Sequence, residues 1–296
     1  MYKPMTGPIC WFGGKGVLSP MFAPYFPEHE TYVEPFGGGA SVLFYKEPTK
    51  KEVYNDLNPG LVNFFRHLQD PDSFRRIFSK AIFSPYAREE YYNFRDNWDK
   101  ESDLVDQAYQ WWLVGKQSFS GHFGSSWSFS SNSGSKNKSM VLTTSSWISV
   151  LNRFNKIHER FKNVIIENMD ALDLLDKYDS EGTWFYTDPP YLGTTRSGGD
   201  YQYDFKDDVL HEKLLKKLCK VKGKVMLSGY PSELYDSLLK DWRKVEIPIA
   251  CMSVGRTRSS GTRGTGTVTG KYDRIEVLYM NYEVKQVKSQ GLFGDE

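Results

Sequence analysis

The stretch that decides the fold reads Thr183-Trp-Phe-Tyr-Thr187-Asp188-Pro189-Pro190-Tyr191. Its apolar first half predicts a buried strand. The two prolines end that strand at once, because neither has an N–H group to give to a sheet ladder. The stretch therefore predicts a rigid corner at the carboxyl end of a strand, which is where open α/β sheets bind their ligands.

The corner combines three chemical features. Asp188 provides a carboxylate, the prolines leave bare backbone carbonyls, and Tyr191 provides an aromatic face. A carboxylate and a carbonyl can accept the two hydrogen bonds of an exocyclic amino group, while the ring stacks on the planar molecule that carries it. A strand-ending turn without a ligand would contain the same residues, so the rest of the chain has to decide between the two interpretations.

Strand-like and helical segments alternate on both sides of this corner. Strands are expected at 31–36, 52–56, 163–169, 183–187, 224–228, 244–250 and 273–281. Helical patterns follow at 40–45, 59–68, 171–178, 209–219 and 232–240. This alternation predicts an α/β fold with a doubly wound, mostly parallel sheet of about seven strands. Only a loop joins the last two strands, so one of them is expected to run antiparallel at the edge.

Residues 64–159 break this alternation. Their first part, 72–112, looks helical and is rich in aromatic residues, and 115–146 is a low-complexity stretch. We interpret 64–159 as an inserted, mainly helical lobe whose function differs from that of the sheet. Residues 1–63 and 160–284 would then form the sheet domain, and 285–296 a flexible tail.

Composition excludes several classes of protein. The 296-residue chain has 39% hydrophobic and 16% aromatic residues, enough for a large α/β domain with an insertion. No apolar run is long enough to span a membrane, and the start lacks the layout of a signal peptide. The 3 cysteines and 5 histidines have no disulfide-framework or metal-ligand spacing. We therefore expect a cytoplasmic protein without a metal site or a membrane partner.

Charge is distributed unevenly, although the formal net charge is only +1. No Asp or Glu occurs at 107–158 or at 247–272, and both windows are rich in Ser, Thr and Gly. Basic side chains, hydroxyls and backbone N–H groups are the usual partners of phosphates. The windows therefore indicate either two surfaces for a polyanion or two solvated loops. Their basic residues include Lys116, Lys136, Lys138, Arg153, Lys156, Arg256, Arg258, Arg263 and Lys271.

A glycine turn or an acid follows each of the first four predicted strands. The first strand ends in Glu34-Pro-Phe36-Gly37-Gly38-Gly39, where glycines allow a ligand to approach the backbone closely. The spacing does not fit the G-x-G-x-x-G fingerprint. The second strand ends at Asp56, which is placed to accept both hydroxyls of a ribose, and Asp170 after the third could accept from an adenine amino group. Together with Asp188, these features predict one ligand site at the sheet edge.

A second glycine loop, Trp11-Phe-Gly-Gly14-Lys15-Gly16, lies near the N-terminus. It lacks the G-x-x-x-x-G-K-[ST] spacing of a Walker A loop. Its lysine can pair with a carboxylate or a phosphate, and Trp11 can cover an apolar face of a ligand.

In this order, the motifs resemble those of the D12 class of DNA adenine-N6 methyltransferases, the Dam-like family. Glu34–Gly39 is similar to the family's S-adenosylmethionine loop, Trp11–Lys15 to the motif that closes over this cofactor, and Asp188–Tyr191 to the catalytic tetrapeptide. Lys116–Trp127 resembles a diverged form of the family's DNA-contacting loop, and the insert occupies the place of its target-recognition domain. The resemblance covers nearly the whole chain outside the insert.

The resemblance implies a Rossmann-like sheet, S-adenosylmethionine as cofactor and double-stranded DNA as partner. The implied catalytic residues are Asp188, Pro189, Pro190 and Tyr191. The implied cofactor-binding residues are Trp11, Gly14, Lys15, Glu34, Phe36, Gly37, Gly38, Gly39, Asp56, Asp170 and Asp188. The expected DNA-binding residues are Lys116, Ser118, His122, Trp127, Lys136, Lys138, Arg196, Arg256, Arg258 and Arg263.

The implied reaction is site-specific methyl transfer to adenine N6. The N6 lone pair is delocalised into the ring, so hydrogen bonds to Asp188 and the Pro189 carbonyl would favour an available lone pair, and Tyr191 would stack on the base. The base would have to flip out, because its amino group is unreachable within the duplex stack. Cytosine-N4 methylation, an RNA substrate and a catalytically silent DNA-binding protein are the alternatives.

Two further partners are considered. A methyltransferase of this kind either acts alone, as a housekeeping or phage enzyme, or accompanies a cognate restriction endonuclease. In the tail, Gln290-Gly-Leu-Phe293 vaguely resembles peptides that dock onto bacterial sliding clamps, although an unstructured tail would have the same composition.

Overall fold

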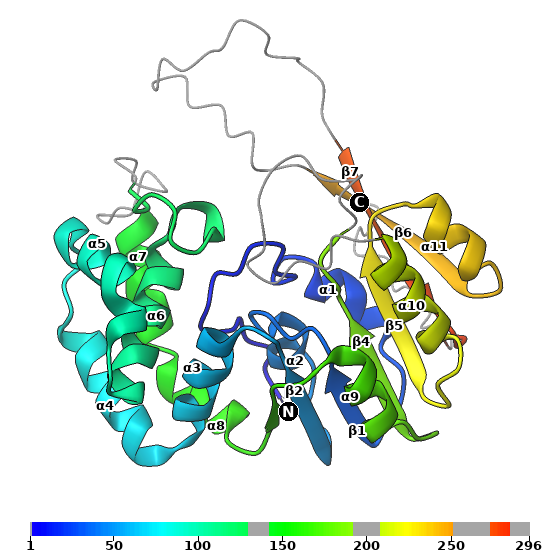
Figure 1. Ribbon diagram of the computed structural model, residues 1–296, viewed down its shortest axis with the longest axis horizontal. Helices are drawn as coiled ribbons and strands as arrows, with labels where there is room; N and C mark the ends of the chain where they lie inside the picture. Colours follow the sequence, from blue (N-terminus) through cyan, green and yellow to red (C-terminus); the bar gives the residue numbers. More distant parts are fainter. Residues whose placement is uncertain (1, 130–141, 192–207, 251–272, 285–296) are drawn as a thin grey trace, which may run out of the picture.

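The computed structural model describes residues 2–129, 142–191, 208–250 and 273–284. Within them, a seven-stranded sheet has the order β3-β2-β1-β4-β5-β7-β6 (Figure 1). The strands are β1 (Thr31–Glu34), β2 (Lys51–Asn55), β3 (Ile165–Glu167), β4 (Thr183–Thr187), β5 (Lys224–Gly229), β6 (Arg243–Ala250) and β7 (Asp273–Met280). Each predicted strand is found, so the predicted α/β fold is confirmed.

The antiparallel strand is β7, and it lies inside the sheet. It pairs with β5 on one side and β6 on the other, antiparallel to both, whereas β3, β2, β1, β4 and β5 are parallel to one another. The crossover through α11 (Glu233–Leu238) leaves a gap one strand wide between β5 and β6, and β7 fills it. The expectation of an antiparallel edge strand is therefore wrong, because β6 takes the edge.

Helices cover both faces of the sheet. Successive side chains of a strand point to opposite faces, so on β4 Trp184 and Tyr186 belong to one core and Phe185 to the other. The Phe185 core is covered by α9 (Ala171–Tyr178), α10 (Asp208–Leu218) and α11. The opposite core is covered by α1 (Ser19–Phe22), α2 (Ser41–Tyr45), α3 (Pro59–Gln69) and α8 (Phe154–Phe161).

The segment 64–159 is mainly helical where the structure describes it. Its elements are α4 (Pro71–Phe83), α5 (Arg88–Asn97), the 3-10 turns η2 (Trp98–Lys100) and η3 (Phe119–Gly121), α6 (Leu104–Gln117) and α7 (Leu142–Leu151). Side chains that can accept hydrogen bonds begin the helices: Asn58 caps α3, Asp70 caps α4 and Asp103 caps α6. Figure 1 shows α4 to α7 grouped beside the sheet, with α3 and α8 between the group and β2.

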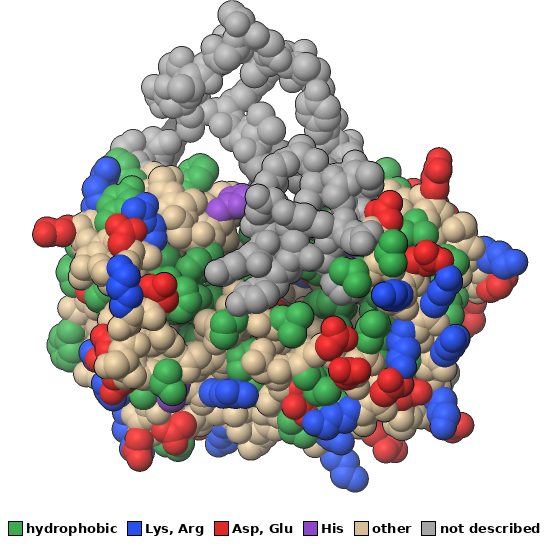
Figure 2. Space-filling view, in the orientation of Figure 1, with side chains coloured by type: hydrophobic (Ala, Val, Ile, Leu, Met, Phe, Trp, Pro, Cys, Tyr) green, Lys and Arg blue, Asp and Glu red, His purple; other side chains and the backbone are tan. Residues whose placement is uncertain are grey.

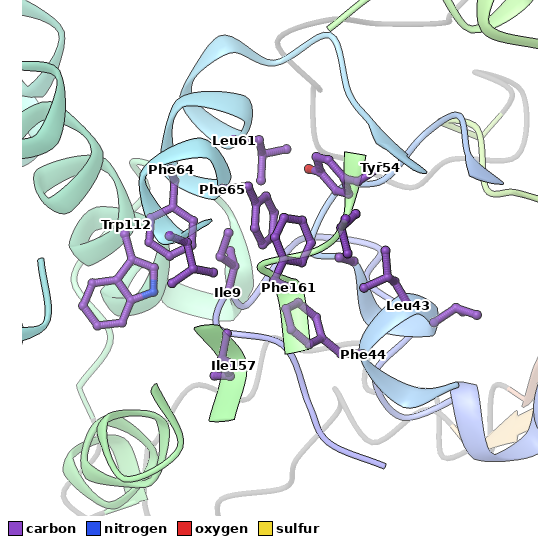
Figure 3. Close-up of a cluster of buried hydrophobic side chains, with 14 of the residues drawn as sticks. Ile9, Leu43, Phe44, Tyr54, Leu61, Phe64, Phe65, Trp112, Ile157 and Phe161 are labelled. Atoms are coloured by element: carbon purple, nitrogen blue, oxygen red, sulfur yellow. The ribbon is translucent and has the colours of Figure 1, made fainter. Parts of the chain in front are cut away.

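One aromatic core runs from the sheet into these helices (Figure 3). The ring centroids of Tyr54 on β2 and Phe65 on α3 lie 4.7 Å apart, and those of Phe65 and Phe161 on α8 lie 4.5 Å apart. A Cβ atom at Gly60 would lie 2.2 Å from the Trp111 ring, so α6 approaches α3 closely. The predicted domain boundaries at 63/64 and 159/160 fall inside α3 and α8, and they stay a prediction.

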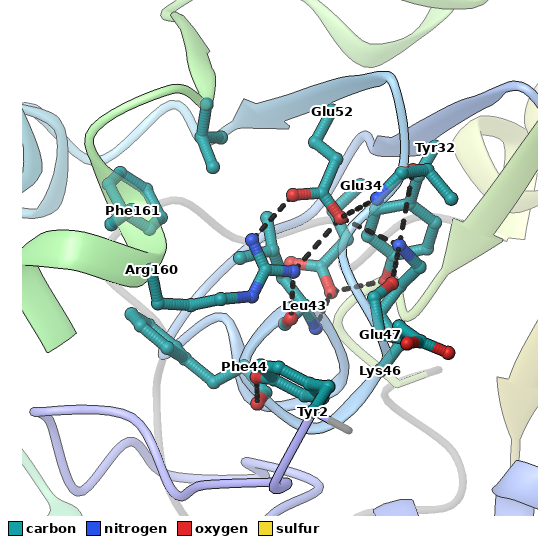
Figure 4. A network of polar contacts seen from close by, with 12 residues as sticks. Tyr2, Tyr32, Glu34, Leu43, Phe44, Lys46, Glu47, Glu52, Arg160 and Phe161 are labelled. Atoms are coloured by element: carbon teal, nitrogen blue, oxygen red, sulfur yellow. Dashed lines mark hydrogen bonds and ion pairs between the residues drawn. The ribbon is translucent and has the colours of Figure 1, made fainter. Parts of the chain in front are cut away.

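A buried ionic cluster joins β2 to α2 and α8 (Figure 4). Glu52 accepts a hydrogen bond from the Lys46 ammonium at 2.6 Å and one from the Arg160 guanidinium at 2.9 Å. Arg160 also donates to the Leu43 carbonyl at 2.6 Å. Burial alone would raise the pKa of Glu52, but Arg160 and Lys46 bring it below its ordinary value. The cluster is therefore charged, and it ties the strand to both helices.

The described surface has no single sign of charge on the face seen in Figure 2. Acidic and basic side chains are mixed around α9, α10 and α11, at the right of the view. Among the described helices, none combines the length and the apolar character that crossing a membrane requires.

Candidate active site

The carboxyl ends of β1, β2 and β4 border a cavity of about 260 Å³. Strand order reverses at β1, which has β2 on one side and β4 on the other, and such a switch point is where α/β sheets bind ligands. The lining includes the loop 11–15, the glycine turn 34–39, the acids Asp56 and Asp170, the corner 188–191 and residues 121–123. The structure thus brings the predicted motifs to one place.

The glycine turn after β1 is packed so tightly that side chains would not fit. A Cβ atom at Gly37 would lie 2.2 Å from the Tyr54 ring, and one at Gly38 would lie 2.9 Å from the Trp11 ring. Gly38 also has φ +47°, a left-handed conformation that favours glycine. The turn therefore presents bare backbone to the cavity between two aromatic rings.

The loop Trp11–Lys15 lies over this turn. The N–H of Gly14 donates to the Trp11 carbonyl at 2.9 Å, which closes a tight turn that carries Lys15 inward. Trp11 lies beside Trp111 of α6, with 6.0 Å between ring centroids. The loop thus connects the insert to the sheet and forms one wall of the cavity.

Glu34 at the end of β1 is buried, and its carboxylate faces α2. Oε1 accepts hydrogen bonds from the Tyr32 hydroxyl and from the N–H of Leu43 at 2.9 Å. Among the described residues, Oε2 has no hydrogen-bond partner. Burial raises the pKa of Glu34 to about 8, because desolvation disfavours the charged form.

The acids after β2 and β3 each support the local backbone. Asp56 accepts the N–H groups of Gly38 and Asn58, both at 2.8 Å. Burial raises the pKa of Asp56 above its ordinary value, and these hydrogen bonds partly offset the shift. Asp170 is exposed and caps α9 by accepting the N–H of Leu172 at 2.7 Å. A carboxylate has about four lone-pair sites, so both acids keep acceptor capacity toward the cavity.

Asp188 forms a buried ion pair with Lys15. The Lys15 ammonium lies 2.6 Å from Oδ1 and 2.8 Å from Oδ2, and the Ser228 hydroxyl donates to Oδ1 at 3.0 Å. Burial alone would lower the pKa of Lys15, but the Asp188 and Glu276 carboxylates raise it above its ordinary value. The lysine is therefore held as an ammonium against the carboxylate of the corner, on the cavity wall.

Tyr191 extends the same network. Its hydroxyl accepts from Lys15 at 2.7 Å and donates to Glu276 on β7 at 3.0 Å. Its ring lies against Tyr230, with 4.3 Å between centroids and 32° between planes. Burial, reinforced by the two carboxylates, raises the pKa of Tyr191 well above its ordinary value. The tyrosine is thus neutral, and it is fixed at both its ring and its hydroxyl.

A corner of this kind beside a glycine turn is what the sequence motifs predicted for a methyltransferase. The family model of the D12 class N6 adenine-specific DNA methyltransferases matches residues 11–255. The chain belongs to this family. It is therefore an adenine-specific DNA methyltransferase rather than a cytosine-N4 enzyme. A Rossmann-like methyltransferase uses S-adenosylmethionine in general.

Proteins similar to this chain come from archaea, bacteria and phage. The chain is 27% identical to the type II methyltransferase M.MjaIII of Methanocaldococcus jannaschii, over 93% of this chain and 98% of that protein. It is 24% identical to the type II methyltransferase M1.LlaDCHI of Lactococcus lactis subsp. cremoris, over 92% and 94% of the two chains. A shorter match, 32% identical over 38% of this chain and 15% of the relative, is to the DNA N-6-adenine-methyltransferase of Escherichia phage P1.

The loop that follows α6 in this D12-class chain borders the cavity. The His122 ring lies against Phe12 of the N-terminal loop, with 4.0 Å between centroids. Phe123 stacks on Trp111, with 5.1 Å between centroids. His122, expected to bind DNA, thus lies on the cavity wall beside the loop predicted to close over the cofactor.

The other predicted DNA-binding residues of this loop differ in exposure. Ser118 is only 4% exposed, and its hydroxyl accepts the N–H of Gly124 and donates to the Val114 carbonyl. These bonds shape the loop, and the expected contact of Ser118 with DNA stays a prediction. Trp127 is half-buried and donates to the Gln117 side chain. Among the described residues, no carboxylate pairs with Lys116.

Several expected residues lie outside the described ranges. They are Lys136, Lys138, Arg196, Arg256, Arg258 and Arg263, together with the tail 285–296 and its Gln290–Phe293 peptide.

Sequence reasoning missed Glu276, Ser228 and Phe123. Ser228, next to the last residue of β5, donates to Asp188, and Phe123 reaches the cavity from the loop after α6. Glu276 had a usable signal, since it is a charged residue inside the apolar strand Ile275–Met280. A buried charge in a strand requires a partner, so its position indicated one.

Proposed function

We propose that this protein transfers a methyl group from S-adenosylmethionine to N6 of an adenine flipped out of double-stranded DNA, at a specific sequence. Family membership supports the chemistry. The observation that carries the assignment of residues is that the Asp188 corner and the Gly37–Gly39 turn meet at one cavity.

The residues around the cavity fit S-adenosylmethionine. Bare backbone at Gly37–Gly39 allows close approach of a ligand. Asp56 would accept the ribose hydroxyls, Asp170 the adenine amino group of the cofactor, and Trp11 would cover an apolar face. When bound, the cofactor supplies an electrophilic methyl group on a sulfonium. The further cofactor-binding residues in this proposal are Gly14, Lys15, Glu34, Phe36 and Asp188.

The corner would hold the target base. Asp188 would accept one N6–H bond and the Pro189 carbonyl the other, which favours a tetrahedral nitrogen with an available lone pair. Oδ2 of Asp188 accepts only from Lys15 among the described residues, so it keeps acceptor capacity for the amino group. Tyr191 would stack on the base, and Pro190 would keep the corner rigid. Proximity to the methyl donor would supply much of the remaining acceleration.

Residues 64–159 would form the target-recognition domain, inserted between the two parts of the catalytic domain, 1–63 and 160–284. Lys116 has no acidic partner among the described residues, which suits a phosphate contact. His122 and Trp127 would lie near the DNA, and the basic residues at 136, 138, 196, 256, 258 and 263 would hold the distorted duplex.

The test is single-molecule sequencing of DNA from a methylation-deficient host that expresses this chain, with Asp188→Ala as control. We expect N6-methyladenine at one short motif and none in the control. Methylation at nearly all adenines would keep the chemistry but make the insert a non-specific clamp. Absence of methylation from the wild-type sample would overturn the proposal.

The cellular setting is proposed from the relatives, two of which are named type II methyltransferases. A cognate restriction endonuclease in the same cytoplasm would then be the functional partner. Deleting that endonuclease's gene should make the methyltransferase dispensable, whereas an unaccompanied enzyme would have no such dependence.

A further inference from the structure

Glu276 is a buried carboxylate that contacts Tyr191 and Lys15 of the candidate active site. It lies on β7, is 1% exposed and is outside the residues 11–255 that match the family model. Its neighbours along the strand, Val277 and Leu278, belong to the two hydrophobic cores. A carboxylate in such surroundings is costly unless it is paired and hydrogen-bonded.

Both partners of Glu276 belong to the candidate site. Among the described residues, it accepts from the Tyr191 hydroxyl at 3.0 and 3.1 Å and lies 3.5 Å from the Lys15 ammonium. The Tyr191 hydroxyl in turn accepts from Lys15 at 2.7 Å. These three groups form a closed triangle that joins the N-terminal loop, the corner after β4 and the antiparallel strand.

We propose that Glu276 is a positioning residue for methyl transfer, acting through the Tyr191 hydroxyl and the Lys15 ammonium. The inference rests on the proposed function, in which Tyr191 stacks on the base and Asp188 accepts its amino group. Because Tyr191 packs against Tyr230 on one side, its hydroxyl bond to Glu276 fixes the remaining freedom of the ring.

The second role of Glu276 is to pair with the positive charge of Lys15. Lys15 lies between two carboxylates, closer to Asp188 at 2.6 Å than to Glu276 at 3.5 Å. When the amino group of the incoming base donates a hydrogen bond to Asp188, the ion pair between Asp188 and the Lys15 ammonium weakens. Glu276 stays 3.5 Å from Lys15, so the buried ammonium keeps a second carboxyl partner as the base enters.

A double-mutant cycle tests this role. Initial rates would be measured with tritiated S-adenosylmethionine and unmethylated genomic DNA for Glu276→Gln, Tyr191→Phe and the double variant. Glu276→Gln preserves shape but loses charge, so we expect kcat to fall about tenfold from the loss of one charged hydrogen bond. The KM for S-adenosylmethionine should stay within about twofold. The effects of the two single variants should not multiply in full, because both remove the hydrogen bond between Tyr191 and Glu276 and only Glu276→Gln also changes the contact with Lys15.

The matched control is Glu246→Gln on the adjacent strand β6, where Glu246 lies opposite Val277 and its side chain is 55% exposed. It should retain the wild-type kcat. The inference is overturned if Glu276→Gln retains that rate too, or if its effect multiplies in full with that of Tyr191→Phe. Melting temperatures would be recorded for every variant. Should Glu276→Gln not fold, a wild-type kcat in Tyr191→Phe would itself overturn the inference.

The same assay separates this inference from the proposed function. An active Asp188→Ala enzyme would overturn both. An inactive Asp188→Ala enzyme with an unaffected Glu276→Gln enzyme would overturn only the role of Glu276.

Discussion

Two ionic clusters of this protein both pair carboxylates with basic side chains, but they differ in composition and in position. Glu52, Lys46 and Arg160 lie beneath α2 and α8 and connect β2 to those helices. Asp188, Lys15 and Glu276 lie at the carboxyl end of β4, and Asp188 and Lys15 line the cavity. In both clusters the opposite charges act against the effect of burial, although burial still raises the pKa of Glu276 above its ordinary value.

The comparison teaches that burial and pairing do not by themselves mark a functional site. In the β2 cluster, Arg160 also donates to the Leu43 carbonyl, and none of the three charged side chains lines the cavity. In the β4 cluster, Asp188 keeps a lone pair and faces a cavity that a ligand can enter. Free acceptor capacity beside a cavity separates the second cluster from the first.

The largest effect is expected from a substitution that breaks the β4 cluster. Asp188→Ala should lower methyl transfer by about 10³-fold or more, because the acceptor for the reacting amino group is lost. Binding of S-adenosylmethionine should survive, since the other proposed contacts, at Gly37–Gly39, Asp56 and Asp170, remain. Filter-bound tritium and calorimetric titration would measure the two quantities. Normal turnover by this variant would contradict the assignment.

The corresponding change in the β2 cluster should affect stability instead. Arg160→Met leaves Glu52 buried with one cation fewer and should lower the free energy of unfolding by about 3–5 kcal/mol. The rate per folded molecule should remain unchanged. Urea unfolding measures the loss, with Arg75→Met as control because the Arg75 side chain is 73% exposed. Equal losses of unfolding free energy in Arg160→Met and Arg75→Met would show that this buried cluster stabilises the fold no more than an exposed ion pair does.

A smaller effect is expected from the acid after β2. Asp56→Ala should weaken binding of S-adenosylmethionine by about tenfold, because ribose hydroxyls lose their acceptor. The kcat at saturating cofactor should change little. Asp173→Ala, an exposed acid on α9, serves as control. An unaltered dissociation constant for Asp56→Ala would exclude the ribose role.

The last predicted effect is the dependence of stability on pH at Glu34. Its pKa is raised from 4.5 to about 8 by burial, so between these values the folded state holds a proton that the unfolded state has lost. Stability therefore falls as pH rises through this range, by up to about 1.4 kcal/mol per pH unit. Glu34→Gln should flatten that part of the curve, as followed by urea unfolding from pH 5.5 to 8.5. A parallel curve for the variant would show that Glu34 is charged throughout.

Much of the site could be predicted because local sequence fixes local conformation. The prolines at 189 and 190 end β4, the glycines at 37 to 39 force the turn after β1, and an acid follows β2. Parallel strands bring their carboxyl ends to one edge. Strand order was not predictable in the same way. β7 lies between β5 and β6, and no short segment of the sequence specifies this position.

The sequence by itself determined the α/β alternation, the corner 188–191 and the family. These depend on the order and spacing of residues along the chain. Only the tertiary structure decided that Lys15 pairs with Asp188, 173 positions away, and that Glu276 accepts a hydrogen bond from Tyr191. Such pairs depend on which strands become neighbours, and that choice is made by the packing of the whole core rather than by local propensity.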